Sequence, residues 1–178
     1  MTSDAPRALV VDASVAVAIL IEEPAGDRAA LILRERDAAG GQIFVPAFFW
    51  LEIVNVLIRR YRQPPGLVLQ SIVDLQTLGL ESVNLDRPHL LLTIDAMERG
   101  ALLSYDAAYL ALAESANAEL LTFDRRLAAA AGSRALLIGG SRAVQEAPAL
   151  YGPSWAAWPG AAAYLRTLRE QVVRQGTG

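Results

Sequence analysis

Short apolar runs alternate with longer stretches of helical periodicity along most of the 178-residue chain. An apolar run of about four to eight residues bounded by turn formers is typical of a buried strand, whereas apolar positions three and four residues apart indicate a helix. Strands are accordingly predicted at residues 8–11, 42–46, 80–85, 119–123 and 134–138.

Helices fill the intervals between these strands. Proline and glycine mark their limits, with Pro24 and Gly26 ending the first helix and Gly100 ending the fifth. A succession of strand–helix units implies a short, mainly parallel sheet covered by helices on both faces, which is a three-layer α/β/α fold. The predicted helices are residues 13–23, 26–39, 47–62, 67–78, 88–99, 104–116 and 125–131.

The pattern changes after residue 140. Residues 1–140 are predicted to form one domain, and residues 141–178 to form a C-terminal extension. An irregular segment containing Trp155 and Trp158 is followed by a helix with one apolar stripe, formed by Leu165, Leu168 and Val172. Two interpretations stay open, since this extension suits packing either on the domain or on a partner.

Composition narrows the class of protein. A hydrophobic content of 53% supplies a well-covered core, and the absence of cysteine excludes disulfides and thiolate chemistry, which suits the cytoplasm. The net charge of −3 argues against a uniformly basic surface that coats nucleic acid. No secretion signal or membrane span is expected, because the apolar run at residues 13–21 is much shorter than about 20 residues.

Four acidic residues stand beside apolar runs. Asp12 and Asp124 follow predicted strands, and the carboxyl ends of parallel strands are where α/β sheets bind ligands. Asp106 lies at the start of an alanine-rich helix. Helix capping is the alternative interpretation of each of these three, because aspartate is a good N-cap residue.

Glu52 does not fit the capping interpretation. Its neighbours in FFWLEIVNVL are almost all apolar, and a buried carboxylate without a partner costs several kcal/mol or has a raised pKa. A surface stripe with Arg59 is the structural alternative. Converging carboxylates favour a hard divalent cation, Mg²⁺ or Mn²⁺, whereas a zinc site is disfavoured without cysteine and with His89 as the single histidine. His89 is instead predicted to lie on the surface at a helix start.

The segments VVDASV, VPAFFWLEIVNVL, SYDAAYLALA and LTFDRRL, in this order over residues 8–138, resemble the PIN-domain family and its VapC toxin branch. The resemblance implies a Mg²⁺- or Mn²⁺-dependent endoribonuclease, a hydrolase that is the toxin of a type II toxin-antitoxin pair. It also implies a homodimer neutralised by a VapB-like antitoxin. On the matching positions it implies a catalytic metal-binding cluster of Asp12, Glu52, Asp106 and Asp124, supported by hydrogen bonds from Ser14, Asn55 and Thr122.

The expected chemistry is hydrolysis of an RNA phosphodiester bond by a water that the cation activates. Asp12 and Asp106 would be the main ligands, and one or two metal ions are both compatible with the sequence. Because the site is negative, arginines should guide the RNA backbone. The candidates, each of which also suits a solvated helix end, are Arg59, Arg60, Arg62, Arg125 and Arg126.

Two rival functions are weighed against this one. The first is a PIN nuclease of RNA processing outside toxin-antitoxin systems, and the second is a non-catalytic module that binds RNA or protein. A phosphatase of the haloacid dehalogenase type is excluded, because it needs a second aspartate where this chain has Ser14.

Overall fold

The computed structural model describes residues 7–138, and in this range the strands form one five-stranded sheet. All neighbouring strands pair in parallel in the order β3-β2-β1-β4-β5. The predicted extension at residues 141–178 lies outside the described residues. The strands are β1 (Leu9–Val11), β2 (Ile43–Pro46), β3 (Leu80–Val83), β4 (Glu119–Thr122) and β5 (Ala135–Leu137).

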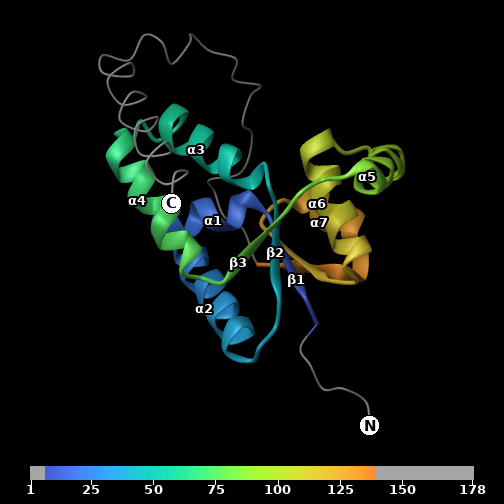
Figure 1. The fold of residues 1–178 in the computed structure, drawn as a ribbon, viewed down its shortest axis with the longest axis horizontal. Helices are drawn as coiled ribbons and strands as arrows, with labels where there is room; N and C mark the ends of the chain where they lie inside the picture. The colour runs from blue at the N-terminus through green and yellow to red at the C-terminus, as the bar shows by residue number, and fades with distance from the viewer. Residues whose placement is uncertain (1–6, 139–178) are drawn as a thin grey trace, which may run out of the picture. The chain divides into compact units, whose positions relative to one another are not determined.

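Helices cover both faces of the sheet. Figure 1 shows α1 to α4 on one side of the strands and α5 to α7 on the other, so the predicted three-layer α/β/α fold is confirmed. Within residues 7–138 no helix is long and apolar enough to cross a membrane. The helices are α1 (Ala13–Leu20), α2 (Pro24–Ala38), α3 (Phe49–Arg59), α4 (Pro65–Gln76), α5 (Arg87–Gly100), α6 (Ser104–Ser115) and α7 (Arg125–Ala131).

Several helix limits differ by a few residues from those predicted, and two of the differences have a clear backbone cause. Pro24 begins α2 instead of ending the helix before it, because proline lacks an N–H that the first turn of a helix does not use. The third helix was predicted over residues 47–62 but spans Phe49–Arg59. Arg62 has a φ of 53°, which breaks helical geometry.

The core lies on both faces of the central strand. Every residue of β1 is buried, as expected for a strand between two helix layers. From one side, α3 contributes Phe49, Ile53 and Leu57, which are spaced four residues apart and share one helix face. From the other side, α6 is buried from Ala107 to Ala113. This packing fixes the helices that carry the acidic residues.

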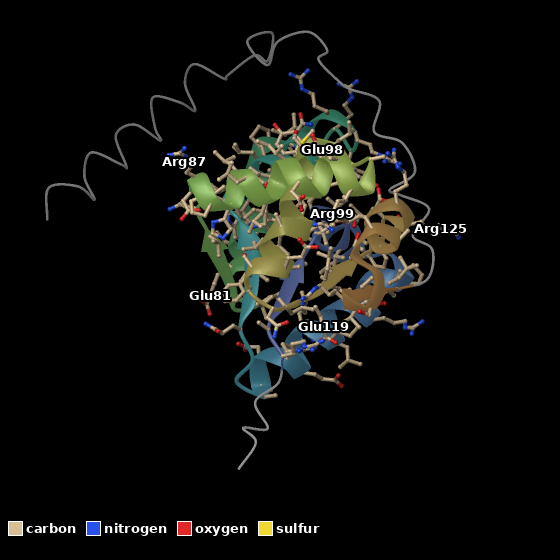
Figure 2. The ribbon with its side chains drawn as sticks, turned by 90° about the vertical axis from the view of Figure 1, so that its right-hand side faces the viewer. Glu81, Arg87, Glu98, Arg99, Glu119 and Arg125 are labelled. Carbon is tan, nitrogen blue, oxygen red and sulfur yellow. The ribbon has the colours of Figure 1, made fainter. Side chains whose placement is uncertain are left out.

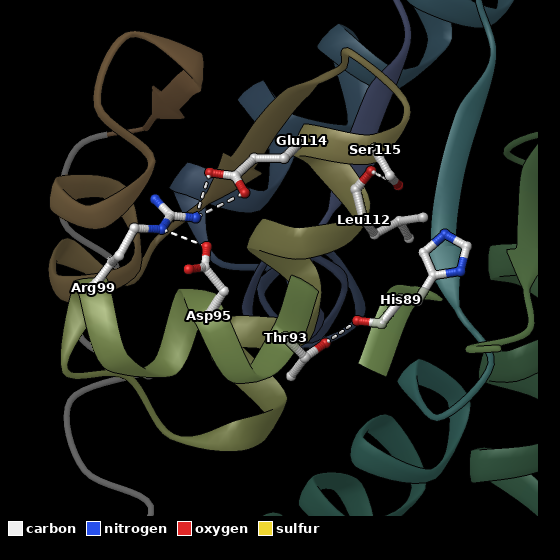
Figure 3. Close-up of polar contacts among 7 residues, drawn as sticks. All are labelled: His89, Thr93, Asp95, Arg99, Leu112, Glu114 and Ser115. Carbon is white, nitrogen blue, oxygen red and sulfur yellow. Dashed lines mark hydrogen bonds and ion pairs between the residues drawn. The ribbon is translucent and has the colours of Figure 1, made fainter. Parts of the chain in front are cut away.

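Salt links tie α5 to α6. Arg99 donates to Asp95 within α5 at 2.7 Å and to Glu114 of α6 at 2.9 Å (Figure 3). His89 lies at the start of α5, where its backbone N–H donates to the N-cap residue Asp86 at 3.1 Å. The prediction that His89 is a helix-start residue is therefore confirmed, although its side chain is half-buried.

Candidate functional site

Two of the acidic residues follow adjacent strands at the point where the strand order reverses. The chain leaves β1 towards β2 and β3, and later returns to place β4 on the other side of β1. Asp12 comes directly after β1, and Asp124 comes two residues after β4. In open parallel sheets this switch point is the usual ligand-binding position, because the loops diverge there.

Asp12 is held by two hydroxyl groups. Its Oδ2 accepts hydrogen bonds from Ser14 Oγ at 2.5 Å and from Thr122 Oγ1 at 2.7 Å. The same hydroxyl oxygens accept from the backbone N–H groups of Phe123 at 3.2 Å and Asp124 at 2.9 Å. Ser14 and Thr122, both expected to support the acids, thus join the ends of β1 and β4 around Asp12.

Burial makes the ionised form of Asp12 unfavourable. Asp12 is only 7% exposed to solvent. Desolvation raises the pKa of Asp12 above its ordinary value, and the charge of Asp124 adds to this effect, while the two hydroxyls oppose it. An aspartate in this position is stabilised in its charged form by a cation.

Glu52 approaches the other acids from α3. It lies in the first turn of this helix and not deeper inside it, as the longer predicted helix implied. Desolvation, together with the charges of Asp12 and Asp106 and against a hydrogen bond from Tyr109, raises the pKa of Glu52 to about 7. A tyrosine and two other acids therefore act on the Glu52 carboxylate.

Asp106 is not an N-cap residue. Helix α6 begins at Ser104, so Asp106 is in its first turn and Leu103 takes the N-cap position. Desolvation, with smaller effects from the charges of Asp12 and Asp124, raises the pKa of Asp106 to about 6. Because the charges of Asp12 and Asp124 act on its carboxylate, Asp106 belongs to the same acidic cluster.

Asp124 both caps a helix and faces the cluster. Its Oδ1 accepts from the backbone N–H groups of Arg126 at 2.6 Å and Leu127 at 3.0 Å, so the capping interpretation is confirmed for this residue. Asp12, in contrast, takes the N-cap position of α1 without a side-chain capping bond. Only Oδ1 of Asp124 accepts these capping bonds, and Oδ2 takes no part in them.

Tyr109 is a contact of the site that the sequence analysis did not identify. Its hydroxyl donates to Glu52 Oε2 at 2.5 Å. The available signal was its position three residues after Asp106 in SYDAAYLALA, which places both side chains on one face of the helix.

The predicted arginines and Asn55 have different relations to the acids. Arg126 donates to the backbone oxygen of Ala101 at 2.9 Å, and its charge partly offsets the raised pKa of Asp106. Arg125 projects outward from α7 in Figure 2. Asn55 is exposed, and within residues 7–138 no hydrogen bond joins it to the acids. The remaining candidates, Arg59, Arg60 and Arg62, lie at or beyond the end of α3, about 10 Å along the helix from Glu52.

The donor set suits a hard cation, although the carboxylates do not yet form a coordination shell. In the part of the chain that the structure describes, no three acidic or histidine side chains are arranged to hold one metal ion. Burial and the charges of neighbouring acids nevertheless raise the pKa values of Asp12, Glu52 and Asp106. Oxygen ligands of this kind are those that Mg²⁺ and Mn²⁺ prefer.

The fold and the site define a parallel α/β domain with an acidic cluster at its switch point. A family model for the PIN domain matches residues 9–133, which is more than half of the chain. The chain belongs to the PIN-domain family, as its motifs predicted.

Solved structures share this fold at low sequence identity. PAE2754 from Pyrobaculum aerophilum has a TM-score of 0.55 at 20% identity, over 72% of this chain and 83% of that one. A toxin-antitoxin complex from Klebsiella pneumoniae has a TM-score of 0.51 at 19% identity, over 66% of this chain and 87% of that one. The sarcin-ricin loop cleaving toxin VapC20 of Mycobacterium tuberculosis has a TM-score of 0.53 at 15% identity, over 69% of this chain and 95% of that one. Among curated protein sequences none matches significantly.

Proposed function

We propose that this protein is a divalent-metal-dependent endoribonuclease and the toxin of a type II toxin-antitoxin module. The observation that carries the proposal is the buried carboxylate of Asp12, surrounded by the charges of other acids at the switch point. Membership of the PIN-domain family supports nuclease chemistry. The similar fold of a toxin from Mycobacterium tuberculosis supports the toxin role.

Each acidic residue has a proposed part. Asp12 and Asp106 would hold Mg²⁺ or Mn²⁺ most directly, while Glu52 and Asp124 would act directly or through water. When bound, the cation would lower the pKa of a water molecule and so supply the nucleophile for phosphodiester hydrolysis. Ser14 and Thr122 orient Asp12, because both hydroxyls donate to the same carboxylate oxygen and leave the other one free of these bonds.

The direct test is incubation of the purified full-length protein with a mixture of RNAs, with Mg²⁺, with Mn²⁺ or with EDTA. We expect cleavage with either metal and none with EDTA, and products that carry a 5′ phosphate and a 3′ hydroxyl. Cleavage that continues undiminished in EDTA would contradict the metal-dependent mechanism. Absence of cleavage with both metals would favour the non-catalytic alternative.

The toxin role implies a protein partner. The Klebsiella pneumoniae relative is a toxin-antitoxin complex, and by analogy we propose a VapB-like antitoxin and a homodimer for this protein. Exposed apolar side chains on α5 support a subunit contact, since such residues favour burial at interfaces. The discriminating observation is a small antitoxin gene next to this one whose product abolishes the cleavage. Its presence supports the toxin role over a PIN nuclease of RNA processing.

Arg126 is the arginine best placed to guide RNA. Its guanidinium is held by Ala101 and acts on Asp106, whereas Arg125 on the same helix projects outward (Figure 2). Arg126→Ala is expected to weaken RNA binding about equally for all sequences and to reduce the salt dependence by about one phosphate contact. Binding of a single-stranded RNA at several salt concentrations measures both effects. Arg125→Ala is the matched variant, and an equal loss in both would refute a specific role for Arg126.

A further inference from the structure

The side chain of Tyr109 crosses from one helix layer to the other. Tyr109 belongs to α6 on one face of the sheet, and Glu52 belongs to α3 on the opposite face (Figure 1). Their hydrogen bond, from Tyr109 Oη to Glu52 Oε2, is 2.5 Å long. It therefore links the two layers at the edge where the acidic residues meet.

The Tyr109 hydroxyl also reaches the end of β1. The charge of Asp12 and the backbone of the next residue, Ala13, both act on the pKa of this hydroxyl, which therefore lies close to the end of β1. Tyr109 lies three residues after Asp106 on α6. The Tyr109 hydroxyl thus joins α6, which carries Asp106, to Glu52 of α3, and lies close to the segment that carries Asp12.

The ring of Tyr109 is fixed by its neighbours. The residue is only 1% exposed, and the ring of Phe48 packs edge-on against it with centroids 5.4 Å apart. Phe48 lies four residues before Glu52 and forms the N-cap position of α3. A ring held in this way presents its hydroxyl to Glu52 in one orientation, which reduces the conformational freedom of the carboxylate before any ligand binds.

The hydroxyl of Tyr109 has a role that packing of the buried ring does not explain. Packing alone needs only the aromatic ring, and phenylalanine would supply it. A glutamate that faces two other carboxylates is repelled by them, so without a hydrogen bond its side chain would turn towards solvent. Residues that orient metal ligands by hydrogen bonds commonly change metal affinity when they are replaced.

We propose that Tyr109 is a positioning residue, whose buried hydroxyl holds the Glu52 carboxylate beside Asp12 and Asp106 in the arrangement that receives a divalent cation. This inference rests on the metal site of the proposed function and adds a residue to it. Tyr109 acts through Glu52 and does not itself contact the cation or the RNA.

The test is Mn²⁺ binding to the full-length Tyr109→Phe protein, measured by isothermal titration calorimetry. The dissociation constant is expected to rise about 10- to 100-fold, the range typical for loss of a residue that orients a ligand. Circular dichroism should show an unchanged fold, because the ring is kept. Tyr105→Phe is the matched control, since it removes an exposed hydroxyl from the same helix, and its Mn²⁺ affinity is expected to equal that of the wild type.

A double-mutant cycle separates positioning from a general structural effect. In a Glu52→Gln background, Tyr109→Phe should cause little further loss of Mn²⁺ affinity, because the carboxylate on which it acts is absent. An unchanged affinity in Tyr109→Phe, or an equal loss in both backgrounds, would overturn the inference. A wild-type protein that does not bind Mn²⁺ would overturn it together with the metal site.

The outcomes for the proposed function are distinct. Wild-type protein that binds Mn²⁺ but cleaves no RNA contradicts the ribonuclease activity, while the affinities of the variants still decide the role of Tyr109. Conversely, the wild-type protein could cleave RNA while the Tyr109→Phe variant binds Mn²⁺ with wild-type affinity. That result supports the ribonuclease activity and rejects the positioning role of Tyr109.

Discussion

Replacing Asp12 with asparagine will reduce RNA cleavage on the order of a thousandfold, the scale for losing an electrostatic group at a reacting centre. Asp12 is the most buried of the acids and lies at the switch point of the sheet. Asparagine keeps the shape of the side chain but removes the charge that a divalent cation needs. Initial rates with saturating Mg²⁺ and with saturating Mn²⁺ measure the loss, and full activity in either would reject the role of Asp12.

The same variant should be at least as stable as the wild type without metal. The side-chain oxygen of asparagine still accepts from the Ser14 and Thr122 hydroxyls, while the unfavourable burial of a charge disappears. Thermal unfolding in EDTA tests this and shows that lost activity is not lost folding. Asp95→Asn is the control, because Asp95 is an exposed acid on α5 whose ion pair with Arg99 is worth little.

The sequence located the acids better than it located their neighbours. The strand–helix alternation placed Asp12 and Asp124 at the carboxyl edge of the sheet, because both follow strands. Which strands lie side by side depends on pairing between distant segments, so the adjacency of β1 and β4 came only from the structure.

The contacts of Glu52 show the same limit. Apolar neighbours along α3 suggested a carboxylate with a raised pKa, but they did not indicate its hydrogen-bond partner. Glu52 lies in the first turn, and its hydrogen bond comes from Tyr109 in a different helix layer. A tyrosine in an alanine-rich helix has the pattern of a core residue, and only its partner across the sheet edge reveals a functional contact.

The metal-free protein will lose stability as the pH rises from about 4 to about 7. Burial raises the pKa of Glu52 to about 7 and that of Asp106 to about 6, above their ordinary values of 4.5 and 3.8. The folded state therefore binds more protons than the unfolded state within this window. The resulting penalty is absent below the unfolded pKa values and complete above the folded ones, and the Glu52 shift alone corresponds to about 3 kcal/mol. Urea unfolding in EDTA at several pH values measures it.

Mn²⁺ should reverse this trend, because it binds the ionised carboxylates and stabilises only the folded state. The increase in unfolding free energy on adding Mn²⁺ is expected to be larger at about pH 8 than at about pH 5. Glu52→Gln should flatten the pH dependence of the metal-free protein, whereas Asp95→Asn should preserve it. Stability that rises with pH in EDTA would contradict the buried acidic cluster, because it would mean that the folded state holds these carboxylates in a favourable charged form without a cation.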